Sequence, residues 1–339
     1  IVALLPFPGV QKVMGSEWGD LLFFGFFLFF VLIFFPPLVR RLWGCKKIPD
    51  GYLKSHLDLF CAKQNFQADY YLWPLFEGRV LTAAVMGIVP GLRYILLTPA
   101  LIETMSRAEL EAIMAHEIGH VKKYHLLLYV FLIIGFSLLV GMLAEPFIYM
   151  FLSLDALNDL IAVSGISAET ALTLVGSVPL LIFMLVYFRF IFGYFIRNFE
   201  RQADLFSLAT IGNSKALVSA FEKISILSGN IRDQRNWHHF GIGERIDCLE
   251  DAENNPGQIR RHNQKVRYSL FAYGAILLLT VLAVRQIPTD ALAQRYQENF
   301  AESVLLQKVK QEPDRALWQR LIGDLMLTRK MEEKALEAY

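Results

Sequence analysis

The sequence is poor in cysteine and in net charge, and each shortage excludes a class of protein. Its three cysteines, Cys45, Cys61 and Cys248, lack metal-ligand spacing and an even count. We therefore expect reduced thiols and no disulfide framework. The formal net charge is only +1, so a nucleic-acid partner is not expected.

Charged residues are also scarce, at 19% of the chain, whereas hydrophobic residues make up 55% and include 27 phenylalanines. This composition is too apolar for a soluble enzyme of this length. Four uncharged stretches approach the roughly 20 apolar residues that cross a bilayer. They are residues 21–39, 126–144, 171–188 and 268–284. Buried core helices are the alternative, but four such stretches favour a multi-pass membrane protein.

The basic residues predict an orientation in the membrane. Arginine and lysine gather at 40–47, 122–123, 197–201 and 260–267. The connector 145–170 holds acidic residues and no Lys or Arg. The positive-inside rule therefore predicts that residues 40–125 and 190–267 lie in the cytoplasm and that the connector 145–170 lies outside.

The segment His116-Glu117-Ile118-Gly119-His120 has the HExxH pattern. On a helix, positions i and i+4 share one face, so His116 and His120 can bind the same zinc ion. Glu117 can then act as the general base toward a water at the metal. Ser106 and Glu109 have the spacing of a capping box and predict where this helix starts.

A catalytic zinc usually has three protein ligands, so a third is needed. The extended HExxHxxGxxH pattern is excluded because Lys122, Lys123 and Leu126 occupy its positions. His125 is one place out of register, and we interpret it as an interfacial or solvated histidine. Glu200 and Asp204 are better candidates, because they share one face of a predicted helix at 190–211. One could bind the metal while the other accepts a ligand histidine's N–H; a charged face with local ion pairs is the alternative.

Short extended segments are predicted at 81–86 and 92–98, with a helix starting at Pro99. Residues 229–262 are expected to be polar and rich in loops. The HEIGH segment, the run from Arg197 to Asp204 (RNFERQAD) and the later His239 and Arg245 in HxxxxxR spacing together resemble the HtpX and CAAX prenyl protease family. These are membrane-embedded gluzincin zinc endopeptidases. The resemblance covers roughly residues 75–250.

The resemblance implies a role for each matching residue. His116, His120 and Glu200 would bind one zinc per chain, with Glu117 as the general base. Asp204 would hold a ligand histidine, His239 would stabilise the oxyanion and Arg245 would brace the site. Thr82, Ala83 and Ala84 would form a strand that pairs with the substrate backbone.

The sequence departs from the family pattern at several places. Phe240 follows the late histidine where the family has proline, and the adjacent His238 makes the choice of His239 depend on spacing alone. Thr82 stands where the family commonly has asparagine. A fourth span follows the catalytic part, so the substrate class cannot be transferred.

We therefore expect a mainly α multi-pass membrane protein, with a gluzincin-type zinc metalloprotease domain, a small β-sheet and about four transmembrane helices. Residues 1–20 are interpreted as an N-terminal segment that could be truncated. The expected parts are a span at 21–39, a cytoplasmic protease part at 40–125, a transmembrane hairpin at 126–190, a second protease part at 191–265, a span at 268–284 and a helical tail at 290–339. The tail resembles the start of tetratricopeptide repeats and could dock a protein partner.

The expected function is a zinc metalloendopeptidase of a bacterial or archaeal cytoplasmic membrane, with its site facing the cytoplasm. Its expected partners are the lipid bilayer and protein or peptide substrates close to the membrane, for quality control or processing. Two alternatives remain: a signalling receptor whose protease domain cleaves a single partner, and a non-catalytic scaffold with a retained fold. The intact Glu117 argues against the scaffold.

Overall fold

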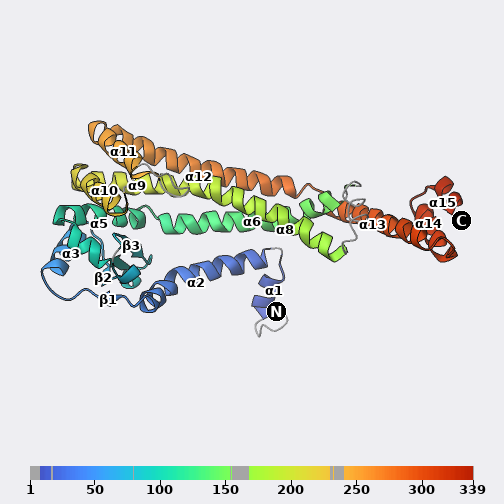
Figure 1. The fold of residues 1–339 in the computed structure, drawn as a ribbon, viewed down its shortest axis with the longest axis horizontal. Helices are drawn as coiled ribbons and strands as arrows, with labels where there is room; N and C mark the ends of the chain where they lie inside the picture. Colours follow the sequence, from blue (N-terminus) through green and yellow to red (C-terminus); the bar gives the residue numbers. More distant parts are fainter. Residues whose placement is uncertain are drawn as a thin grey trace. The chain divides into compact units, whose positions relative to one another are not determined.

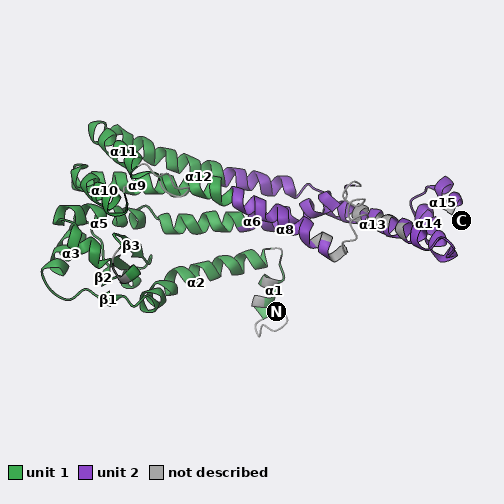
Figure 2. Ribbon diagram, viewed as in Figure 1, with its two compact units in different colours: residues 1–136, 187–273 green, residues 137–186, 274–339 purple. Residues whose placement is uncertain are grey.

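The structure is a computed structural model that describes residues 8–16, 18–78, 80–152, 154, 168–229, 232 and 240–338. The chain forms two compact units, shown in Figure 2. The first comprises residues 1–136 and 187–273, and the second comprises residues 137–186 and 274–339. The HEIGH segment and both predicted carboxylates belong to the first unit.

Among the described residues, the first unit holds a small sheet with strands in the order β1-β2-β4-β3. The strands are β1 (Lys46–Lys47), β2 (Asp69–Leu72), β3 (Ala83–Met86) and β4 (Tyr94–Leu97). β2 and β4 pair in parallel, and β3 pairs antiparallel with β4 with Ala83 opposite Leu97. All four residues of β4 are buried, as its unbroken apolar sequence requires. β3 lies at one edge of this sheet and β1 at the other.

Helices complete one hydrophobic core together with this sheet (Figure 1). They are α3 (Tyr52–Lys63), α4 (Pro99–Thr104), α5 (Arg107–Lys122), α9 (Gly193–Ile211), α10 (Lys215–Leu227) and α11 (Ile242–Asn254), with short 3₁₀ turns η2 (Leu75–Gly78) and η3 (Pro90–Leu92). α5 is the central element, because it packs against β3, α9 and α10. Met114 and Ile118 on α5 are fully buried in this core.

Long apolar helices form much of the remaining chain: α2 (Gly19–Leu42), α6 (His125–Leu152), α8 (Ala168–Val186) and α12 (Gly257–Val284). α8 continues through the π-helical η4 (Tyr187–Phe192) into α9. Within the described residues, four segments are long and apolar enough to cross a membrane: Gly19–Leu42, His125–Leu152, Thr173–Ile211 and Gly257–Val284. They expose large apolar side chains, such as Phe26 and Phe271, which a bilayer would cover. The predicted mainly helical membrane fold is confirmed.

The prediction of a loop-rich segment at 229–262 is wrong for its second half, because α11 and the start of α12 lie there. α11 is a polar helix with one apolar stripe, formed by Ile246, Leu249 and Ala252, which are buried. This spacing of three residues is helical. Residues 230, 231 and 233–239 of the segment lie outside the described part of the chain.

The N-terminal helix α1 (Pro8–Met14) precedes α2 in the first unit. The C-terminal part of the second unit contains α13 (Thr289–Gln311), α14 (Ala316–Thr328) and α15 (Glu332–Ala338). Ile322 and Met326 of α14 and Ala335 of α15 form a small buried cluster. The two helices therefore pack as a helical hairpin.

Candidate active site

The HEIGH segment lies near the C-terminal end of α5, and the start of this helix is fixed by its own side chains. The Ser106 hydroxyl accepts a hydrogen bond from the Glu109 N–H, and the Glu109 carboxylate accepts one from the Ser106 N–H. The predicted capping box is therefore confirmed. His116 and His120 follow on the same face of the helix, one turn apart.

A close contact between α5 and α9 brings the third candidate ligand to the two histidines. A Cβ placed on Gly119 would lie only 3.2 Å from the Cα of Ala203 and from two carbon atoms of Phe206. Glycine at this position therefore lets the two helix backbones approach closely. The contact places Glu200 of α9 opposite the paired imidazoles.

Three donor atoms converge at this point. The Nε2 atoms of His116 and His120 are 3.2 Å apart. His120 Nε2 lies 3.4 Å from Glu200 Oε1, and His116 Nε2 lies 3.8 Å from Glu200 Oε2. Ligand atoms of all three residues lie within 4.8 Å of one another. Two imidazole nitrogens and one carboxylate oxygen are the donors of many catalytic zinc sites, so this group fits a zinc ion.

His116 is held from its other ring nitrogen by Asp204. Its Nδ1 lies 2.8 Å from Asp204 Oδ1, and both side chains are nearly fully buried. Arg245 of α11 donates two hydrogen bonds to the same carboxylate, at 2.8 Å and 2.6 Å. Burial opposes the charged form of His116, but the contact with Asp204 outweighs it and raises the His116 pKa. Asp204 thus lies at the Nδ1 atom of His116, and Glu200 lies on the side of its Nε2 atom.

His120 lies in a different environment. Burial, followed by the positive charge of His116, lowers the pKa of His120 to about 3. The ring is therefore neutral at physiological pH, which is the form that binds metals. His125 lies directly behind it, with the two Nδ1 atoms 2.9 Å apart. The prediction of an interfacial or solvated His125 is wrong, because its side chain is fully buried.

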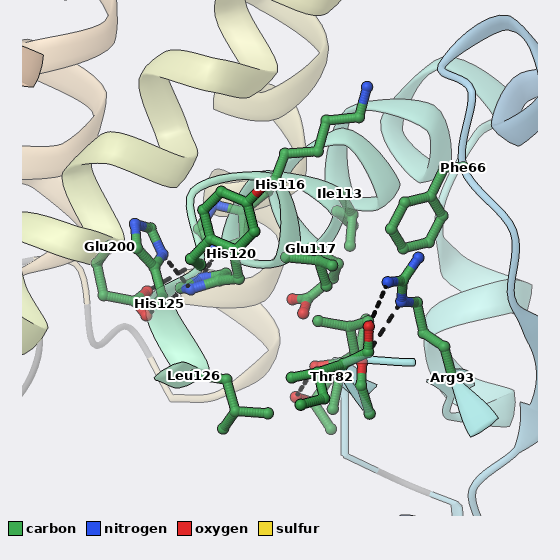
Figure 3. A pocket seen from close by; sticks show the side chains of 18 of the residues that line it. Phe66, Thr82, Arg93, Ile113, His116, Glu117, His120, His125, Leu126 and Glu200 are labelled. Atoms are coloured by element: carbon green, nitrogen blue, oxygen red, sulfur yellow. Dashed lines mark hydrogen bonds and ion pairs between the residues drawn. The ribbon is translucent and has the colours of Figure 1, made fainter. Parts of the chain in front are cut away.

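Glu117 lies between the histidines and the sheet. Figure 3 shows its carboxylate directed toward the segment around Thr82, beside His120. Burial, with a smaller contribution from the negative charge of Glu200, raises the pKa of Glu117 to about 7 although His116 opposes the shift. A carboxylate with such a pKa can both accept and return a proton near neutral pH.

One cavity of about 1050 Å³ is lined by His116, Glu117, His120 and Glu200. The segment Thr82–Val85 lines one side, and Leu126 and Tyr129 at the start of α6 line another. Apolar side chains of α5 and α10, including Ile113, Leu217 and Phe221, also line it. The cavity is large enough for several residues of an extended peptide. The structure thus brings together all the predicted site residues that it describes; His239 and its neighbour His238 lie outside the described residues.

Sequence reasoning assigned no role to two further residues at the site. Gln202 Oε1 lies 3.0 Å from His125 Nε2, and Gln202 also donates a hydrogen bond to the side chain of Asn263 on α12. The only sequence signal for Gln202 was its position two residues after Glu200. Asn263 is polar and precedes an apolar stretch, which gave no indication of a contact.

The chain is similar to known proteins in sequence profile and in fold. Residues 47–253 match the profile described as peptidase family M48. The chain is also similar to a crystal structure of S. mikatae Ste24p, with a TM-score of 0.50 and 19% sequence identity. The match covers 71% of this chain and spans 60% of the length of the Ste24p chain. No match is found among curated proteins. The structural likeness shows a shared fold.

Proposed function

This chain belongs to peptidase family M48, and from that premise we propose that it is an integral-membrane zinc endopeptidase. One observation carries the proposal: the donor atoms of His116, His120 and Glu200 lie within 4.8 Å of one another, next to Glu117. M48 metalloproteases use zinc, and this donor set suits that ion. The residues of this chain and their roles are part of the proposal.

His116, His120 and Glu200 would hold the ion, and Asp204 and Arg245 would keep the His116 ring in place. A bound zinc ion supplies a Lewis acid that polarises a carbonyl and makes water a better nucleophile at neutral pH. Glu117 would remove a proton from the attacking water and then deliver it to the leaving amine. Its pKa of about 7 suits both transfers. His239 is proposed, from the family resemblance alone, to stabilise the oxyanion.

The substrate would bind as an added strand on β3. This strand pairs with β4 along one edge, and its residues Ala83 and Ala84, with the preceding Thr82, line the cavity. An extended peptide can bind such an edge through main-chain hydrogen bonds, with little preference for sequence. Thr82 itself is tied to Thr98, because its N–H donates to the Thr98 hydroxyl at 3.2 Å. This bond fixes the start of the strand.

The substrates would be protein segments close to a membrane. The cavity reaches Leu126 and Tyr129 at the start of the apolar helix α6, which supports a site near the bilayer surface. The basic flanks of the apolar helices support a cytoplasmic location for residues 40–125 and 191–265. We propose that the protein resides in a bacterial or archaeal cytoplasmic membrane and that α13 to α15 dock a protein partner.

The test uses the full chain in detergent. We expect one zinc per chain by elemental analysis and cleavage of an unstructured protein such as casein. The variant Glu117→Gln should keep the zinc and lose cleavage by a factor of about 10²–10⁴. Glu200→Ala should lose the zinc. A wild-type protein that binds zinc without cleaving would favour the non-catalytic scaffold, and equal cleavage by Glu117→Gln would remove Glu117 from the mechanism.

A further inference from the structure

His125 faces the candidate ligand His120 although their spacing in sequence does not favour it. Residues five positions apart on one continuous helix point about 140° away from each other. Here α5 ends at Lys122, and Tyr124 adopts a left-handed backbone with φ of 58°. Such a conformation is uncommon for a residue other than glycine. The turn redirects the chain, so that His125 at the start of α6 lies against His120.

The His125 ring is held at one face and at both nitrogens. It stacks on Phe199 of α9, with ring centroids 4.6 Å apart and planes 9° from parallel. Its Nδ1 lies 2.9 Å from His120 Nδ1, and its Nε2 lies 3.0 Å from Gln202 Oε1. The side chain is fully buried. A buried histidine with both nitrogens engaged has one orientation and one set of proton positions.

The chemistry of Gln202 determines those proton positions. Its Nε2 donates to Asn263, so its Oε1 is the atom that faces His125. A carbonyl oxygen only accepts, so His125 Nε2 must carry the hydrogen. When the His125 ring carries a single hydrogen, at Nε2, its Nδ1 atom is an acceptor, and the hydrogen between the two rings belongs to His120 Nδ1. This leaves the lone pair of His120 on Nε2, which faces His116 and Glu200.

We propose that His125, oriented by Gln202 and Asn263, is a positioning residue that holds His120 in the tautomer and rotation needed for metal binding. The proposal rests on His120 being a zinc ligand, as the proposed function states. The two histidines would then be held in different ways. The charged pair of Asp204 and Arg245 contacts His116, whereas hydrogen bonds through the uncharged side chains of Gln202 and Asn263 orient His125 against His120. Partners of this kind typically affect metal affinity by about 10- to 100-fold.

The test measures zinc affinity by competition with a chromophoric chelator, on the full chain in detergent. His125→Leu removes the acceptor, and we expect zinc binding to weaken by about 10- to 100-fold. His125→Asn returns an acceptor oxygen near the position of Nδ1 and should restore most of the affinity. Gln202→Leu should weaken binding, whereas Gln202→Glu, which still accepts from His125, should not. The visible spectrum of the cobalt-substituted protein should change with His125→Leu and return toward wild type with His125→Asn.

His262 provides the matched control. It is another buried histidine of the same unit, and its Nε2 lies 3.0 Å from the main-chain oxygen of Asn198. His262→Leu should lower the melting temperature and leave zinc affinity unchanged. Equal losses of affinity in His262→Leu and His125→Leu would show general destabilisation and overturn the proposal, as would wild-type affinity in His125→Leu.

His120→Ala separates this inference from the proposed function. If the wild type binds zinc and His120→Ala does not, the proposed site stands, and the His125 variants then decide the inference alone. A wild type without zinc, or a His120→Ala variant with unchanged affinity, would overturn both.

Discussion

Removing Arg245 should destabilise the protein strongly. Arg245 donates two hydrogen bonds to Asp204, and the two side chains are only 14% and 3% exposed. Arg245→Leu leaves the Asp204 carboxylate buried, with the His116 imidazole as its remaining described contact. Breaking a buried pair from one side costs about 3–5 kcal/mol. At about 2–4 °C per kcal/mol for a domain of this size, the melting temperature should fall by roughly 10 °C.

A double-mutant cycle tests the reasoning. Melting temperatures of the zinc-free protein, measured for Arg245→Leu, Asp204→Asn and the double variant, give the coupling between the two side chains. We expect the double variant to be more stable than the sum of the single losses predicts, because neither charge is then left unpaired. Additive losses, or a wild-type melting temperature for Arg245→Leu, would refute the assignment of a buried, energetically coupled pair.

Three further predictions concern the base, the metal and the start of α5. Because the pKa of Glu117 is raised to about 7, this base is protonated and inactive at lower pH. A bound cation would lower the pKa. A pH profile of kcat/KM should therefore fall with decreasing pH, with its midpoint at or below pH 7. Treatment with a chelator should abolish casein cleavage and added zinc should restore it, and cleavage that survives verified zinc removal would contradict a metal-dependent reaction. Although burial opposes the shift, hydrogen bonds from Lys223 and Ser219 lower the pKa of Glu109 from 4.5 to about 2. This depressed folded-state pKa means that the carboxylate stabilises the fold by about 3 kcal/mol above pH 4.5 and loses this contribution as the pH falls through 2. Glu109→Gln should therefore lower the melting temperature at pH 7, and an unchanged melting temperature there would contradict the shift.

The helical parts of the site could be predicted from sequence because their signals are local. The capping box at Ser106 and the i, i+4 spacing of His116 and His120 each depend on residues within one or two helical turns. The same spacing placed Glu200 and Asp204 on one face. The structure puts Glu200 at the Nε2 side of the histidines and Asp204 at the Nδ1 side of His116, a distinction that spacing alone left open. The catalytic roles stay predictions.

The contacts that sequence reasoning missed depend on the tertiary fold. β1 and β2 were not predicted: β1 has only two residues, both lysines, and β2 pairs with β4, a contact distant in sequence. α11 was missed because its polar composition concealed the buried stripe. His125 was interpreted as interfacial or solvated because it is one place out of register, but the left-handed turn at Tyr124 brings it against His120.

The close contact at Gly119 links the distance between α5 and α9 to the distance between Glu200 and the two histidines. A methyl group on this residue would meet the Ala203 Cα at 3.2 Å, so α9 would have to shift outward and carry Glu200 with it. The capping box at the start of α5, which involves only Ser106 and Glu109, would remain intact through such a shift. A larger residue in place of Gly119 should therefore first lower the affinity of the proposed site for zinc, in a protein that still folds and inserts normally.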